Sequence, residues 1–135
     1  MIIVGDSVNK KLQIVKTEVI FMSDQQTILM LARVLKSSDQ AIMVNQLLTW
    51  QYEEVRINDP EDFHEGTWWV YMPIRAWQGQ LSWISERTIQ RYFRDLTEQG
   101  IVIVGNFNED RFDQTNWYSL DYQALNQLIQ EKGRK

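Results

Sequence analysis

A chain of 135 residues, 44% of them hydrophobic, is long enough for one globular domain with its own core, and this composition argues against disorder. The chain has no cysteine, which excludes disulfides and zinc fingers. It has neither a signal-peptide pattern nor an apolar run near the roughly 20 residues of a membrane span, so we expect a cytoplasmic protein. The formal net charge of −4 excludes a generally basic protein, so any binding to nucleic acid must depend on how the charges are distributed.

The N-terminal part of the chain predicts strands followed by a helix. Residues 10–22 are rich in β-branched side chains and predict one or two strands, and we expect residues 1–9 to be flexible. Ser23 and Asp24 can cap a helix over residues 25–36, whose apolar side chains lie on one stripe.

A second helix is predicted from Ser37 or Ser38 to about Tyr52. Its apolar residues nearly encircle it, which predicts a central core helix: Ala41, Ile42, Val44, Leu47, Leu48 and Trp50. Residues 53–66 predict an exposed acidic loop. Residues 51–65 contain six carboxylates and one arginine, so the net charge of the remainder of the chain is slightly positive.

The next predicted elements are a short strand and a short helix. Residues 67–72, TWWVYM, predict the strand. Pro73 suits the first turn of a helix that ends near Gln80, and residues 79–82 predict the turn that follows.

The helix predicted over residues 85–99 has two opposite faces. Its apolar side chains recur at i, i+4 and i+7 and predict a buried stripe: Ile89, Phe93 and Leu96. Polar side chains on the opposite side are free to face a partner: Arg87, Gln90, Arg91 and Arg94. Ser85 is a good N-cap, and Gly100 can adopt the left-handed conformation that ends a helix.

Two β-prone runs, residues 101–107 and 115–120, follow around a polar loop, and a last helix is predicted over residues 122–131 before a tail at 132–135. The elements follow one another as a helix, a glycine and two strands around a loop, which is the order of a recognition helix followed by its hairpin. The sequence therefore predicts one α+β domain over residues 1–135, a winged helix-turn-helix with additional N-terminal strands and a C-terminal helix.

Duplex DNA is the partner that this arrangement most often binds, with the N-terminal residues of the second helix at base edges and nearby cations on phosphate. The predicted DNA-binding residues are Arg75, Ser85, Arg87, Thr88, Gln90, Arg91, Arg94 and Arg111. The alternative is a solvated helix face on which arginine and carboxylate side chains pair at i,i+4: Arg91 with Asp95, and Arg94 with Glu98.

No enzymatic activity, metal or other cofactor is predicted. His64 is the only histidine, and the carboxylates around it match no trusted ligand spacing, so we interpret this segment as a solvated loop. The six tryptophans could stack on single-stranded bases, but their positions predict core packing. Trp68 and Trp69 must point to opposite faces of a strand, so one of them could lie in an interface.

Several blocks of the chain, within residues 12–126, carry a resemblance to a known family. They are residues 41–50, 69–71, Trp77, 83–85, 87–89, 96–100, 105–108 and 113–122. Together they resemble the winged-helix N-terminal domain of phage and plasmid replication proteins, the replisome-organiser or DnaD-like group. The resemblance implies DNA binding linked to replication initiation and assembly with replication proteins. A protein-binding winged-helix module and a transcriptional regulator remain the alternatives.

Self-association is also predicted, as a dimer. Two linked modules would compensate for the weak phosphate attraction of one slightly basic face. Apolar residues 1–4 and the β-prone edge of residues 15–22 offer the surface for it.

Overall fold

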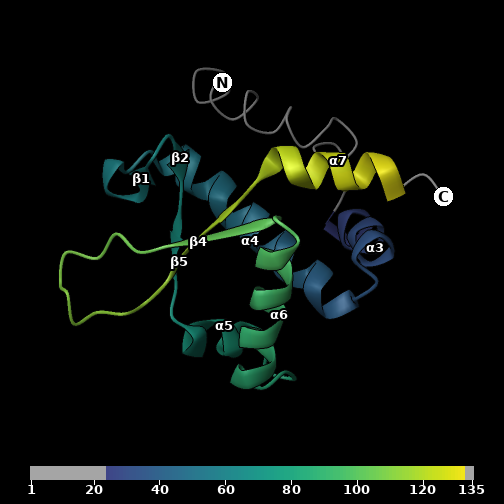
Figure 1. The fold of residues 1–135 in the computed structure, drawn as a ribbon, viewed down its shortest axis with the longest axis horizontal. Helices are drawn as coiled ribbons and strands as arrows, with labels where there is room; N and C mark the ends of the chain where they lie inside the picture. Colours follow the sequence, from purple (N-terminus) through teal and green to yellow (C-terminus); the bar gives the residue numbers. More distant parts are fainter. Residues whose placement is uncertain (1–23, 133–135) are drawn as a thin grey trace.

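The computed structural model describes residues 24–132, which contain five α-helices and two small antiparallel sheets (Figure 1). The helices are α3 (Asp24–Leu35), α4 (Ser38–Ile57), α5 (Ile74–Gln80), α6 (Glu86–Glu98) and α7 (Tyr122–Lys132). The strands are β1 (Phe63–His64), β2 (Thr67–Trp68), β3 (Val70–Tyr71), β4 (Val102–Gly105) and β5 (Trp117–Leu120), and a 3₁₀ helix, η1 (Pro60–Asp62), precedes β1. The α+β class is therefore confirmed, whereas the predictions for residues 1–9 and 10–22 lie outside the described residues.

The larger sheet has the strand order β3-β5-β4, with β5 antiparallel to both neighbours. The smaller sheet is the β1–β2 hairpin, which turns at two residues with positive φ, Glu65 and Gly66. The single strand predicted over residues 67–72 is thus wrong, because the chain changes its pairing partner at Trp69. The amide of Trp69 instead donates a 3.0 Å hydrogen bond to the carbonyl oxygen of Asp62. Both Trp68 and Trp69 are buried within the chain.

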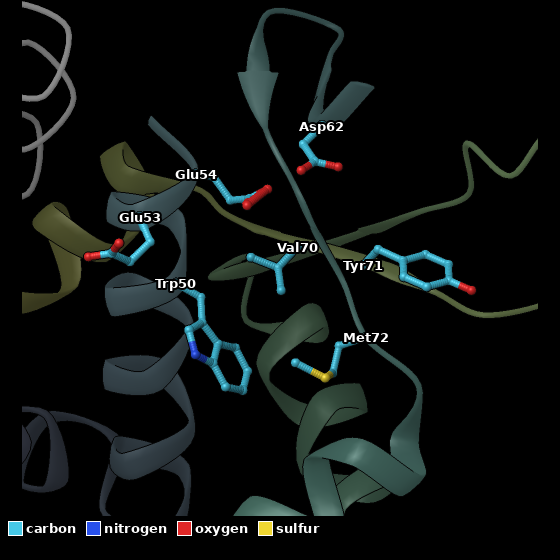
Figure 2. A pocket seen from close by; sticks show the side chains of 7 residues that line it. All are labelled: Trp50, Glu53, Glu54, Asp62, Val70, Tyr71 and Met72. Carbon is cyan, nitrogen blue, oxygen red and sulfur yellow. The ribbon is translucent and has the colours of Figure 1, made fainter. Parts of the chain in front are cut away.

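The predicted acidic loop over residues 53–66 is also wrong in its first part, because α4 continues to Ile57. The buried face of α4 continues at a spacing of four residues through Gln51 to Val55, so the helix gains packing by extending. Figure 2 shows Glu53 on the last turns of this helix, where its carboxylate forms a 2.8 Å salt bridge with Arg56. Asn58, with a φ of 61°, ends the helix in the left-handed conformation.

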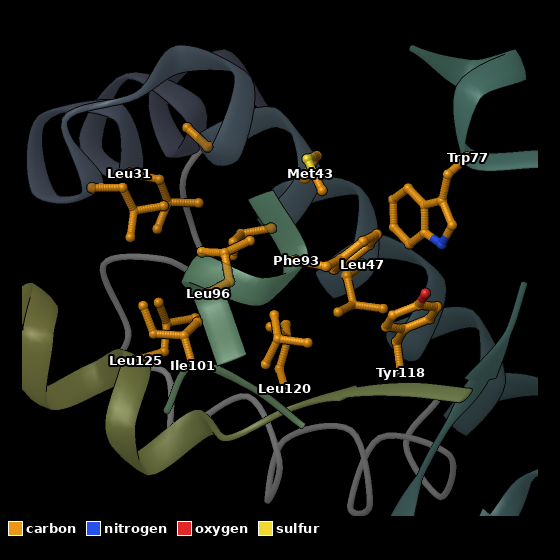
Figure 3. Close-up of a cluster of buried hydrophobic side chains, with 14 of the residues drawn as sticks. Leu31, Met43, Leu47, Trp77, Phe93, Leu96, Ile101, Tyr118, Leu120 and Leu125 are labelled. Carbon is orange, nitrogen blue, oxygen red and sulfur yellow. The ribbon is translucent and has the colours of Figure 1, made fainter. Parts of the chain in front are cut away.

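The core lies between α4, α6, the larger sheet and α7, as Figure 3 shows. Trp77 of α5 is fully buried and contacts Phe93 edge to face, with 4.9 Å between ring centroids. Phe93 in turn stacks on Tyr118 of β5 at 4.3 Å. These aromatic contacts join α5 and α6 to the middle of the sheet.

α6 has the two faces that the sequence predicts, since its apolar stripe is buried and its arginines are exposed. Ser85 Oγ accepts a 3.1 Å hydrogen bond from the Thr88 amide, as expected of an N-cap. Gly100 has a φ of 79° and donates to the carbonyl oxygen of Thr97, while Ile101 donates to that of Leu96. This pair of bonds is a Schellman motif, which closes the helix.

Trp83 departs from its predicted core position, since 60% of its surface is exposed. The turn between α5 and α6 places Leu81 and Ile84 in the core, so the two residues between them, Ser82 and Trp83, face outward. α7 includes Lys132, which the sequence had assigned to the tail, and residues 133–135 lie outside the described residues. Within residues 24–132, no helix combines the length and the apolarity needed to cross a membrane.

Candidate nucleic-acid interface

The outward face of α6 presents three exposed arginines, Arg87, Arg91 and Arg94, together with exposed Gln90. Arg75, on α5, is exposed as well. Within the described part of the chain, the predicted pairs of Arg91 with Asp95 and of Arg94 with Glu98 do not form. Internal ion pairs therefore do not neutralise the arginines of this face. A DNA-binding face and a solvated face remain the two alternatives, and they differ in whether these arginines contact a partner.

The side of α6 next to α4 is fixed by a carboxylate. Asp39, in the first turn of α4, accepts hydrogen bonds from the indole of Trp83 at 3.1 Å and from the hydroxyl of Tyr92 at 3.2 Å. Asp95 accepts a longer bond of 3.4 Å from Gln40. These contacts hold the middle of α6 and the turn before it against α4, so the arginine face has a defined orientation.

Ser85 and Thr88 lie at the start of α6, where both hydroxyls take part in capping. Ser85 Oγ lies 3.0 Å from Thr88 Oγ1, in addition to accepting from the Thr88 amide. Glu86 is exposed in the same turn. A carboxylate there stabilises the helix dipole but repels phosphate, which weakens this end as an anion site.

A groove of about 280 Å³, called here the α6–β4 groove, lies beside the arginine face. Its apolar lining includes residues from α5, α6 and the sheet: Ile74, Phe93, Val104 and Tyr118. Its polar walls include two of the predicted contact residues, Gln90 and Arg94, and the carboxylate of Glu98 offsets the charge of Arg94.

The β4–β5 loop, residues 106–116, is held by hydrogen bonds of its own side chains. The Asn108 amide donates to the carbonyl oxygens of Asp113 at 2.7 Å and Thr115 at 2.9 Å, and its oxygen accepts from the Trp117 indole at 2.7 Å. Asp113 accepts from the Thr115 amide and the Tyr71 hydroxyl, and these bonds lower the pKa of its carboxyl. The loop is therefore an ordered projection.

Arg111, the last predicted contact residue, lies on this loop, which projects away from α6 in Figure 1. Its guanidinium carbon is 5.1 Å from the centroid of the Phe112 ring. Three carboxylates share the loop: Glu109, Asp110 and Asp113. The structure thus brings Arg87, Gln90, Arg91 and Arg94 together on α6, with Arg75 on the neighbouring helix, but it leaves Arg111 in an acidic surrounding.

An aromatic cluster at the base of the loop was missed by sequence reasoning. The His64 imidazole stacks flat on Phe107, with 4.2 Å between centroids, and the rings of Trp69 and Trp117 meet Phe107 edge on. His64 Nε2 also lies 2.7 Å from the carbonyl oxygen of Glu61. The sequence feature that could have predicted this cluster is the pair of aromatic residues at each end of residues 63–69, a pattern that fits a packed hairpin better than a solvated loop.

A second hollow, of about 360 Å³, lies between α4 and β3 and contains the carboxyl groups of Glu53, Glu54 and Asp62 (Figure 2). Burial raises the pKa of Glu54 to about 8, with further contributions from a hydrogen bond to Asp62 and from the charges of Asp62 and Asp59. Among residues 24–132, no group of three or more histidine or carboxylate side chains is placed to hold a metal ion.

No family model, curated protein or solved structure matches this chain.

Proposed function

We propose that this chain is a winged helix-turn-helix protein that binds duplex DNA, with α6 as its recognition helix. The order α4, β3, α5, α6, β4 and β5 supports the winged-helix assignment, with the β4–β5 loop as the wing. The observation that carries the DNA proposal is the outward face of α6, where Arg87, Arg91 and Arg94 are exposed opposite a buried apolar stripe.

The position of each side chain along α6 suggests its role. Arg87 and Arg91, in the N-terminal half, are assigned to guanine edges in the major groove, and Gln90 to an adenine edge. Ser85 and Thr88 lie where the helix would meet the duplex. Arg94 and Arg75 are assigned to backbone phosphates.

The affinity of one copy for DNA should be low and should fall steeply with salt. Arg111 offers a single cation on a wing with three carboxylates, so α6 and α5 must supply most of the phosphate contacts. The resemblance of residues 105–108 and 113–122 supports a role in initiation of phage or plasmid replication, and replication genes beside this one would favour that role over transcriptional regulation.

Fluorescence anisotropy of a labelled duplex at two salt concentrations tests the proposal. Arg87→Ala with Arg91→Ala should weaken binding, and Arg94→Ala should lower the log–log salt slope by about 1, because Arg94 is assigned to a phosphate. A matched control, Arg56→Ala with Lys132→Ala, removes the same charge from α4 and α7 and should bind like the wild type. Absence of binding at low salt, or equal binding by the two double variants, would overturn the proposal.

A further inference from the structure

The turn before α6 carries an exposed tryptophan. Trp83 is 60% exposed, whereas the other five tryptophans of the chain are buried or half-buried. It lies two residues before Ser85, the N-cap of α6, and four residues before Arg87. A large ring that the core does not bury is the kind of side chain that contacts a partner, because such a contact removes much apolar surface from water.

The indole of Trp83 is fixed at its polar edge. It donates to Asp39 Oδ1 at 3.1 Å, and the other oxygen of this carboxylate accepts from the Tyr92 hydroxyl at 3.2 Å. The backbone is fixed as well, since Leu81 and Ile84 are buried and the Ile84 amide donates to the Leu81 carbonyl oxygen at 2.9 Å. The exposed surface of the ring is therefore positioned before a partner binds, so that contact with it costs little conformational entropy.

The charges around this indole balance one another. Asp39 and exposed Glu86 are negative, whereas Arg87 and Arg91 are positive. Arg91 belongs to the same surface, because its guanidinium carbon lies 5.4 Å from the centroid of the Tyr92 ring, whose hydroxyl shares Asp39 with the indole. A phosphate therefore gains little attraction at the indole itself, and the group that fits the ring is flat and uncharged.

A nucleobase is such a group, and it stacks on aromatic side chains with little dependence on its identity. The Trp83 surface is continuous with the face of α6 to which duplex DNA is assigned, and this continuity favours DNA as its partner. In a duplex the faces of each base are covered by the neighbouring base pairs. The ring can therefore stack only on a base that has left the duplex stack.

We propose that Trp83 stacks on an unpaired base next to the duplex that α6 contacts. The preferred ligand is then a junction between a single strand and a duplex rather than a continuous duplex. Arg87, in the first turn of α6, reads a base pair beside the junction, and Arg94 and Arg75 keep their phosphate contacts. This inference rests on the proposed function and deepens it, because it names the form of DNA that the protein selects.

Fluorescence anisotropy with three labelled DNAs tests the stacking. They are a blunt duplex, the same duplex with a single-stranded extension, and the same duplex with an extension of abasic nucleotides. The two extended DNAs carry equal numbers of phosphates, so charge alone cannot distinguish them. The wild type should bind the extension with bases about tenfold more tightly than the abasic one, as expected of one stacked base.

Variants of the ring assign this preference to Trp83. Trp83→Ala should lose it and should still bind the blunt duplex like the wild type, because most of the ring lies outside the core. Trp83→Phe should keep part of it, since a phenyl ring also stacks. The matched control is Tyr52→Ala, which removes an exposed ring about 20 Å along α4 from Asp39 and should keep the full preference.

Tryptophan emission gives a second readout. Stacking should quench it on the extension with bases, and Trp83→Phe should lack this quenching. Equal wild-type binding of the two extended DNAs would overturn the inference, as would an undiminished preference in Trp83→Ala. Wild-type binding to the blunt duplex in either case leaves the proposed function standing, so the two failures are distinguishable. Binding to none of the three DNAs would overturn both.

Discussion

The Gln51 side chain of α4 donates a 2.8 Å hydrogen bond to the Ser119 hydroxyl of β5, although 68 residues separate them. Gln51 is fully buried and makes three more bonds there. Its amide nitrogen donates to the carbonyl oxygen of Trp68 at 2.6 Å, and its oxygen accepts from the Leu120 amide at 3.2 Å and the Tyr122 hydroxyl at 3.0 Å. One side chain thus joins the central helix to β2, β5 and α7, and burial raises the pKa of the Tyr122 hydroxyl so that it stays a neutral donor.

Gln51→Leu should lower the free energy of unfolding by about 2–4 kcal/mol, because the buried Leu120 amide and neighbouring polar groups lose their partner. Ser119→Ala should cost about 1 kcal/mol, and the double variant should cost less than the sum. Urea unfolding measures all three. Gln123→Leu on the exposed side of α7 is the control, and a similar loss there would contradict the role of Gln51.

Leu96→Ala should lower the free energy of unfolding by about 2–5 kcal/mol, because Leu96 is fully buried and its truncation leaves a cavity. Leu29→Ala, at a 59% exposed position, should stay within about 0.5 kcal/mol of the wild type. Thermal unfolding followed by circular dichroism compares the two. Equal losses would mean that α6 does not pack as described.

Gly105→Ala should destabilise the protein by about 1–3 kcal/mol through overpacking. A Cβ at residue 105 would lie 2.9 Å from Phe107 Cε2 and 3.2 Å from Trp69 Cη2, and the stacked His64 ring limits how far Phe107 can shift. Gly79→Ala is the matched control: its Cβ meets no atom within 4 Å, and in helix α5 it should stabilise by about 0.5–1 kcal/mol. A stable Gly105→Ala protein would show that the aromatic cluster is looser than described.

The raised pKa of Glu54 predicts a stability that depends on pH. In the folded chain this carboxyl keeps its proton up to about pH 8, whereas in the unfolded chain its pKa is near the ordinary value of 4.5. The unfolded state therefore binds fewer protons between these values, and this group makes the free energy of unfolding fall as pH rises from about 4.5 to about 8.

Glu54→Gln should remove this component, so the variant should be more stable than the wild type at pH 8, with the difference shrinking towards pH 4.5. Melting temperatures across this range measure it, with Glu131→Gln on α7 as the control. A difference independent of pH would refute the assigned protonation of Glu54.

Local patterns in the sequence determined the helices well. The spacing of Ile89, Phe93 and Leu96, the cap at Ser85 and the glycine at residue 100 fix α6, because each acts within one or two turns of the backbone. The exposed arginines of the candidate interface follow from the same periodicity, since the side opposite a buried stripe must face outward.

Only the tertiary structure decided features that depend on contacts between distant segments. The extension of α4 to Ile57 rests on the burial of Gln51 and Val55 against β2 and β5, and the break at Trp69 rests on two different pairing partners. The α6–β4 groove joins α5, α6, β4 and β5, and Trp83 is exposed because Leu81 and Ile84 occupy the core. Periodicity specifies which face of an element is apolar, but the partner of that face is chosen by chain segments that are remote in sequence.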